Sequence, residues 1–228
     1  MLENRSFDHF CGYLRVGNPE ICGLMGTEFN YVNPADTTSE QVDVSDDAPY
    51  VPDLNPGPGH EVRDVLVQLN GVNGGFVYDY AQQVGVSPQE ARRVMQSFAP
   101  AKLPALARLA QEFAICDKWH SSLPGPTWPN RLFAHCATSG GFVDNNPHQF
   151  TMRTIFEKLS DVQLDSWRIY FHDTPQSLML RNLRNARYLR FFEHFDAFAR
   201  DCANGTLPRY SFIEPRYFSI LGAALRPD

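Results

Sequence analysis

Residues 124–131 have the sequence PGPTWPNR, which sets a hydroxyl, an amide and a guanidinium among three prolines. Proline fixes φ and lacks a backbone donor, so the stretch favours a rigid loop over a helix or a central strand. Thr127 would have little freedom there, and a covalent nucleophile or a phosphate-contacting hydroxyl needs such fixed placement. An ordinary proline-rich connection is the alternative, and the pattern alone favours it.

The chain around this stretch predicts an α/β fold with a mainly parallel central sheet flanked by helices. The expected helices cover residues 103–113, 154–159 and 191–203, and the expected strands cover 113–116, 167–171 and 210–213. Regular alternation of helix and strand is typical of parallel sheets. Ligand sites in such sheets lie in the loops after strands, so the loop that follows 113–116 is where a site is expected.

The first half of the chain shows less periodicity. Phe7 and Phe10 fit one face of a short helix with Asn4 or Ser6 as its N-cap, and a loop-rich excursion with at most short strands covers about residues 12–59. Apolar residues then recur at helical spacing within 60–70. Ser87-Pro88-Gln89-Glu90 predicts another helix start, with a capping box and a proline at the first position.

Composition narrows the classes of function. The 228 residues include 20 basic and 26 acidic side chains, and the net charge of −6 argues against a general nucleic-acid binder and against strong attraction to anionic membrane surfaces. A local surface of either kind stays open. No apolar run reaches transmembrane length, and no signal peptide is evident at the start, so the compartment stays open. Five cysteines at irregular spacings predict neither a disulfide framework nor a structural zinc site. Nothing in the sequence sets the oligomeric state.

Three segments carry a resemblance to a known family. LENRSFDHFCG at 2–12 resembles the signature MENRSFDHxxG, and residues 124–131 resemble GPTxPNR. Both signatures belong to the phosphoesterase family that contains bacterial phospholipases C and an acid phosphatase. YSFIEPRY at 210–217 is similar to a third family segment, and the three occur in the family's order, so the resemblance covers about residues 1–218.

The resemblance implies an alkaline-phosphatase-like α/β fold and a hydrolase acting on phosphate ester bonds. It implies Thr127 as the nucleophile, and one divalent metal ion bound by Glu3, Asn4 and Thr127. The substrate would be a phosphate ester or a phospholipid. The residue types suit this chemistry, because carboxylate and amide oxygens are hard donors and a metal beside a hydroxyl lowers its pKa. Taken alone, an adjacent glutamate and asparagine are more often a solvated helix start.

The resemblance also implies roles for three further residues. His60 is similar to a histidine that contacts the phosphoryl group in the acid phosphatase branch, although a histidine after a glycine turn is more often without chemistry. Asn130 and Arg131 are candidates for binding phosphate oxygens or for holding the loop. The second role is the better fit for Arg131, whose guanidinium can satisfy several acceptors at once.

Two departures from the family pattern lead us to expect a partial phosphoesterase domain over 1–228. The apolar strand that normally precedes the first signature is missing, and no segment resembling the acidic YDEHGG stretch follows residue 217. With fewer carboxylates the metal would bind weakly. The alternative to an enzyme is a truncated, non-catalytic fragment or binding module of the same fold.

For the other polar groups we expect structural roles rather than roles in a site. The pairs Cys116/His120 and His135/Cys136 lack the usual metal spacing, and Asp173 suits a turn. Four arginines recur every three residues from 181 to 190, and on an α-helix they would spread over roughly half its circumference. We expect a solvated basic side there, with a phospholipid headgroup contact as the functional alternative.

Overall fold

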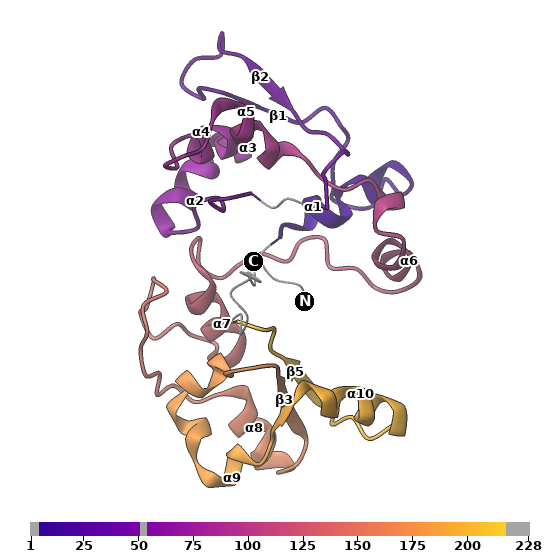
Figure 1. Ribbon diagram of the computed structural model, residues 1–228, viewed down its shortest axis with the longest axis vertical. Coiled ribbons are helices and arrows are strands. Elements are labelled where there is room, and N and C mark those ends of the chain that lie inside the picture. Colours follow the sequence, from indigo (N-terminus) through magenta and orange to yellow (C-terminus); the bar gives the residue numbers. More distant parts are fainter. Residues whose placement is uncertain (1–4, 51–53, 218–228) are drawn as a thin grey trace. The chain divides into compact units, whose positions relative to one another are not determined.

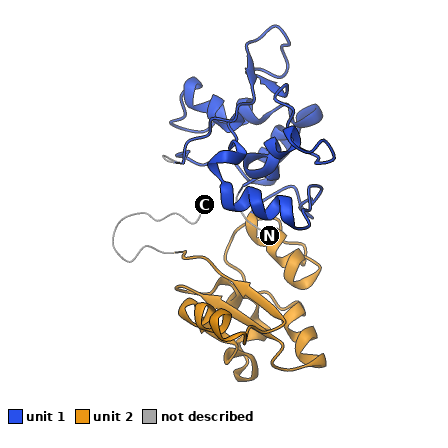
Figure 2. Cartoon of the chain, turned by 90° about the vertical axis from the view of Figure 1, so that its right-hand side faces the viewer, with its two compact units in different colours: residues 1–126 blue, residues 127–228 orange. Residues whose placement is uncertain are grey.

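The computed structural model of the chain describes residues 5–50 and 54–217 (Figure 1). The chain divides into two compact units, residues 1–126 and residues 127–228 (Figure 2), and each is considered by itself. The expectation of one partial phosphoesterase domain stays a prediction.

Unit 1 is built mainly from short helical segments and one hairpin. Its elements are α1 (Phe7–Cys11), η1 (Gly12–Val16), β1 (Phe29–Tyr31), β2 (Gln41–Asp43), α2 (Val62–Gln68), α3 (Asn70–Asn73), α4 (Phe76–Ala81), α5 (Pro88–Ala91), η2 (Arg92–Met95), η3 (Pro100–Lys102) and α6 (Pro104–Glu112). Side-chain hydrogen bonds determine where several of these helices begin. The Ser6 hydroxyl accepts from the backbone N–H of His9 at the start of α1, and Ser87 and Glu90 form the predicted capping box of α5.

The hairpin β1–β2 is antiparallel and pairs Asn30 with Val42. Val42 lies in a core cluster with Val77 and Tyr80 of α4. The buried Asn30 side chain donates to the carbonyl of Asn73 at 3.0 Å and accepts from the backbone N–H of Val77 at 3.3 Å. A buried amide needs such partners, so these contacts link the hairpin to the helices of unit 1.

Helix α2 occurs where expected, but its buried face differs from the apolar one. Leu66 is 57% exposed, whereas Asp64 and Gln68 are buried. The Gln68 amide donates to the carbonyl of Gly59 at 2.6 Å and to the carboxylate of Asp79 at 2.7 Å. Polar partners from the turn before α2 and from α4 therefore decide which side of this helix faces inward.

Unit 2 contains a three-stranded parallel sheet. Its elements are α7 (Thr127–Cys136), α8 (Ile155–Val162), β3 (Trp167–Phe171), η4 (Gln176–Met179), η5 (Arg181–Arg184), α9 (Ala186–Leu189), β4 (Phe192–His194), α10 (Phe195–Asn204) and β5 (Tyr210–Ile213). The strand order is β4-β3-β5, with Ile169 opposite both Phe192 and Phe212. Helix and strand alternate as expected, so the α/β class is confirmed, although this sheet is small.

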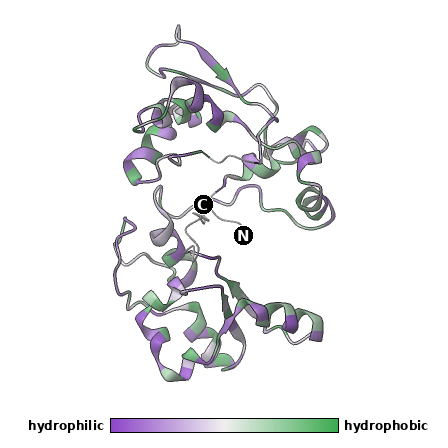
Figure 3. Ribbon diagram, viewed as in Figure 1, coloured by the Kyte–Doolittle hydropathy of each residue, from purple (hydrophilic) through white to green (hydrophobic). Residues whose placement is uncertain are grey.

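The core of unit 2 lies around β3 and α8. Phe156, Trp167 and Ile169 are fully buried, and the rings of Phe156 and Trp167 lie 4.9 Å apart. Burying a large apolar side chain contributes roughly 1.5–3 kcal/mol, so this cluster is a main source of stability. Helix α10 carries both hydrophobic and hydrophilic residues (Figure 3). Its Asp201 accepts from Arg168 at 3.0 Å and from the Tyr170 hydroxyl at 2.6 Å, which links the helix to β3.

Three expectations about elements are wrong. Residues 113–116 form no strand, and Phe113 is 70% exposed. A short apolar run becomes a strand only beside a partner, and no strand of the described residues pairs with it. The helix expected from Phe191 begins at Phe195, because β4 precedes it, and it ends as predicted before Gly205 in the left-handed conformation. Residues 181–190 form a short 3₁₀ helix (η5) and a short α-helix (α9) instead of one continuous helix.

All five cysteines are free thiols. No helix of the described residues combines the length and the apolar character needed to cross a bilayer.

Candidate active site

Thr127 is the first residue of α7, so the expectation that residues 124–131 form a non-helical loop is wrong. Pro126 precedes the helix and Pro129 lies in its first turn. First-turn N–H groups have no partner within a helix, so proline is tolerated there and its fixed φ favours the helical backbone. Both prolines are almost fully buried while Thr127 is partly exposed. Thr127 therefore lies, partly exposed, at a rigid helix start.

Trp128 links the start of α7 to two other segments of unit 2 by hydrogen bonds. Its backbone N–H donates to the side-chain oxygen of Asn145 at 2.9 Å, and its indole N–H donates to the side-chain oxygen of Gln176 at 3.1 Å. Asn145 lies in the loop between α7 and α8, and Gln176 begins η4. The residue next to Thr127 is thus positioned by contacts that are distant in sequence.

Arg131 makes a second set of contacts one helical turn later. Its Nη1 donates to the Gln176 side chain and to the Tyr217 hydroxyl, each at 2.7 Å, and its guanidinium lies 5.5 Å from the centre of the Tyr217 ring. Burial is the main reason why the pKa of Tyr217 lies above its ordinary value. These contacts are those of a residue that holds α7, and a role for Arg131 in binding substrate stays a prediction.

A buried carboxylate supports the same segment from β5. Glu214 is 1% exposed and accepts from the backbone N–H of Gln176 at 2.6 Å, from that of Ser177 at 3.0 Å, and from the Ser177 hydroxyl. Several donors on one carboxylate offset the cost of burying its charge. The sequence predicts no role for Glu214, although the segment that contains it resembles the family. A glutamate directly after an apolar strand was the available signal.

A cavity of about 40 Å³ lies beneath α7, and His135 is one of its lining residues. The ring is buried, and its Nδ1 has no hydrogen-bond partner among the described residues. Burial, followed by the charge of Arg131, lowers the pKa of His135 from 6.5 to about 4. Its edge-on contact with Phe212, at 4.6 Å between ring centres, completes an environment suited to a neutral imidazole.

The remaining predicted site residues lie in three different parts of the chain. Asn130 lies three residues after Thr127 on α7, a spacing that places two helical residues on neighbouring positions of one face. His60 is exposed and lies in unit 1, just before α2. Glu3 and Asn4 fall outside the described residues. The assigned roles of all these residues stay predictions.

No group of three or more His, Cys, Asp or Glu side chains suited to a metal ion occurs within 5–50 and 54–217. Of the three predicted ligands, only Thr127 lies in that part of the chain. The donor types nevertheless suit a hard divalent cation, since a carboxylate, an amide oxygen and a hydroxyl are all oxygen ligands. The metal is therefore a proposal that depends on Glu3 and Asn4.

The chain belongs to the phosphoesterase family, whose profile matches residues 1–222. This match covers the first signature, the Thr127 segment and the Glu214 segment together. The resemblance stated from the sequence is thereby confirmed.

Related proteins include plant and bacterial phospholipases C. Non-specific phospholipase C3 of Arabidopsis thaliana is 38% identical over 99% of this chain and 46% of its own length. Non-specific phospholipase C6 of the same plant is 37% identical over 100% of this chain and 44% of its own length. Phospholipase C A of Mycobacterium tuberculosis is 29% identical over 94% of this chain and 48% of its own length. The chain thus spans a little under half the length of these relatives.

Proposed function

We propose that this chain carries the nucleophile-bearing part of a hydrolase that acts on phosphate ester bonds, of the phospholipase C or acid phosphatase type. Thr127 is the nucleophile in this proposal. The observation that carries it is the fixed position of Thr127 at the start of α7, within the family match. The names of the phospholipase C relatives support a phosphodiester of a phospholipid as substrate. An alkaline-phosphatase-like arrangement of the whole fold is part of the proposal.

The chemistry follows from the placement of the hydroxyl. The Thr127 oxygen attacks phosphorus and loses its proton, the bond from phosphorus to the leaving alcohol breaks, and the alcohol oxygen takes up a proton. Water then cleaves the phosphothreonine and restores the hydroxyl. Pro129 has no N–H and the Trp128 N–H is bonded to Asn145, so at the start of the ten-residue α7 it is the helix dipole that favours a negatively charged phosphoryl group.

Other residues of the chain have supporting roles in this proposal. Asn130 contacts phosphoryl oxygens from the same helix, and Arg131 keeps α7 in place through Gln176 and Tyr217. His60 is a further candidate for phosphoryl contact. Glu3, Asn4 and Thr127 would bind one divalent metal ion, which when bound would lower the pKa of the hydroxyl and neutralise phosphoryl charge.

Hydrolysis of 4-nitrophenyl phosphate and 4-nitrophenyl phosphorylcholine, with added divalent metals, tests the proposal. Thr127→Ala should abolish the rate, whereas Thr151→Ala, an exposed threonine in the same unit, should leave it unchanged. Equal rates for the wild type and Thr127→Ala would contradict the nucleophile assignment. The alternative of a non-catalytic binding module predicts no rate for any variant with any metal.

A further inference from the structure

The segment from Thr174 to Phe192 contains four arginines and no acidic residue, in a chain whose net charge is −6. It forms η4, η5 and α9 (Figure 1). Arg181 and Arg184 open and close η5, which is a 3₁₀ helix. Positions three apart eclipse one another in such a helix, so these two side chains leave the same side. The expectation of arginines spread around an α-helix is therefore wrong here.

All four arginines are exposed, and none is ion-paired with a carboxylate of the described residues. Arg184 Nε donates to the carbonyl of Leu178 at 2.6 Å, which orients its guanidinium. The other contacts of these guanidinium groups are with rings: Arg187 lies 5.5 Å from the ring centre of Tyr188, and Arg190 lies 4.8 Å from that of Phe191. Their positive charges thus face solvent without local neutralisation.

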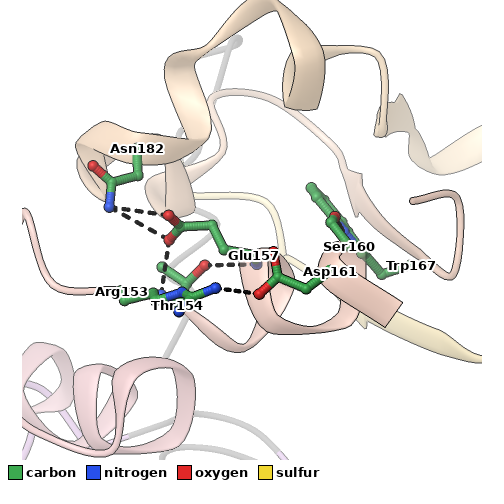
Figure 4. Close-up of polar contacts among 7 residues, drawn as sticks. All are labelled: Arg153, Thr154, Glu157, Ser160, Asp161, Trp167 and Asn182. Carbon is green, nitrogen blue, oxygen red and sulfur yellow. Dashed lines mark hydrogen bonds and ion pairs between the residues drawn. The ribbon is translucent and has the colours of Figure 1, made fainter. Parts of the chain in front are cut away.

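The neighbouring acidic groups already have partners within the fold. An open hollow beside η5 is lined by Glu157, Arg181, Asn182, Arg184, Asn185 and Tyr188. The Glu157 carboxylate accepts from the backbone N–H of Thr154 at 2.8 Å and from the Asn182 amide at 3.2 Å, and Arg153 pairs with Asp161 (Figure 4). Glu157 therefore caps α8 and keeps its single negative charge, so the four arginines outnumber it and leave the surface net positive.

The same segment exposes an apolar side chain. Leu189, at the end of α9 and next to Arg190, is 43% exposed. A basic surface with an exposed apolar residue fits the boundary between lipid headgroups and acyl chains, where arginine stems also remain in apolar surroundings. Nucleic acid would make no use of the exposed leucine, whereas a bilayer would bury it.

We propose that the arginine surface formed by Arg181, Arg184, Arg187 and Arg190, together with Leu189, docks the protein onto bilayers that contain anionic phospholipids. This surface lies within unit 2 and does not include Thr127. Docking brings an enzyme to a lipid surface without any contact at the reacting phosphate. It therefore goes beyond the proposed function and does not depend on the nucleophile assignment.

Sedimentation of the 228-residue chain with vesicles tests the proposal. The vesicles are phosphatidylcholine alone, and phosphatidylcholine mixed with phosphatidylserine. Wild type should bind the mixed vesicles, bind those of phosphatidylcholine alone much less, and dissociate as salt rises, because the attraction to anionic headgroups is screened. The quadruple variant Arg181→Gln, Arg184→Gln, Arg187→Gln and Arg190→Gln should lose roughly tenfold or more in partitioning.

A matched variant controls for net charge. Arg63→Gln, Arg108→Gln, Arg200→Gln and Arg209→Gln remove four exposed arginines outside the surface, and this variant should bind like wild type. Circular dichroism and thermal unfolding of each variant establish that the chains are folded. Leu189→Ser should weaken binding at high salt more than at low salt, since its contribution is apolar.

Some results would overturn the proposal. These are equal binding by wild type and the arginine surface variant, an equal loss in the matched variant, and binding to nucleic acid without binding to vesicles. Thr127→Ala should bind mixed vesicles like wild type. This result separates docking from hydrolysis, because a failed nucleophile assignment would leave it unchanged.

Discussion

Glu214 accepts two hydrogen bonds from Ser177, one from its backbone N–H at 3.0 Å and one from its hydroxyl. Because Gln176 also donates to Glu214 and accepts from Arg131 of α7, the end of β5 is linked to the helix that begins at Thr127. The support for the candidate nucleophile is thus a chain of polar contacts between elements far apart in sequence.

Replacing Glu214 tests this support. Glu214→Ala leaves the donors of Gln176 and Ser177 without their acceptor in a buried place, and we expect the free energy of unfolding to fall by about 3 kcal/mol. Glu214→Gln keeps the shape and one acceptor, and should lose about half as much. Urea unfolding followed by circular dichroism measures both. Asp165→Ala, an exposed carboxylate in the same unit, is the control, and an equally small effect of Glu214→Ala would contradict the role.

A second prediction concerns Thr154, the N-cap residue of a helix in unit 2. Its hydroxyl accepts from the backbone N–H of Glu157 at 3.2 Å and caps α8 (Figure 4). Thr154→Ala should lower the free energy of unfolding by about 1 kcal/mol, whereas Thr154→Ser keeps the cap and should lose much less. Similar urea midpoints for Thr154→Ala and wild type would show that the cap is dispensable.

His135 should make stability depend on pH. Its pKa is about 4 in the folded chain and near 6.5 when unfolded, because burial disfavours the charged ring. Above pH 6.5 neither state is protonated and there is no penalty. As the pH falls from 6.5 to 4, the unfolded state binds the proton first, and the free energy of unfolding should drop by about 3 kcal/mol.

The matched variant for this prediction is His135→Phe, which keeps an aromatic ring and cannot be protonated. Its unfolding free energy, measured by urea titration at pH 7 and at pH 4.5, should change less between the two values than that of wild type. Equal pH dependence in the two proteins would assign the effect to other groups.

Thr127 should carry a phosphoryl group during turnover. Acid quenching of the enzyme mixed with 4-nitrophenyl phosphorylcholine should trap the phosphorylcholine ester of Thr127, because nitrophenol leaves and acid stops the water step that releases the remaining group. Peptide mass spectrometry locates the modification. Thr127→Ser should also be trapped and Thr127→Ala should not; phosphorylation found elsewhere in wild type would identify a different nucleophile.

Elements determined by local signals could be predicted from the sequence. The capping box of Ser87 and Glu90 places α5, and β-forming residues over Trp167–Phe171 give β3 with the observed bounds. Glycine at 205 ends α10 in the left-handed conformation, as a helix terminator should. In each case the deciding chemistry lies within a few residues.

The predictions that were wrong depended on distant partners. The apolar run from Phe113 to Cys116 resembles a strand, but a strand needs a neighbour to pair with. Residues 124–131 contain three prolines, and only their position in and before the first turn of α7 makes a helix compatible with them. The role of Glu214 could not be predicted either, because its hydrogen-bond partners Ser177 and Gln176 lie 37 and 38 residues earlier in the chain.

The contacts of Arg131 also have a consequence for the order of synthesis. Its two acceptors lie 45 and 86 residues downstream of it. A growing chain therefore exposes α7 long before Gln176, and longer still before Tyr217, emerges to bind it. β5 cannot pair with β3 until the same late stage, and such non-local pairing is slow. The helix start that bears Thr127 therefore gains its Gln176 and Tyr217 contacts only once the chain through β5 has emerged, so the candidate nucleophile is not yet held in place in the nascent protein.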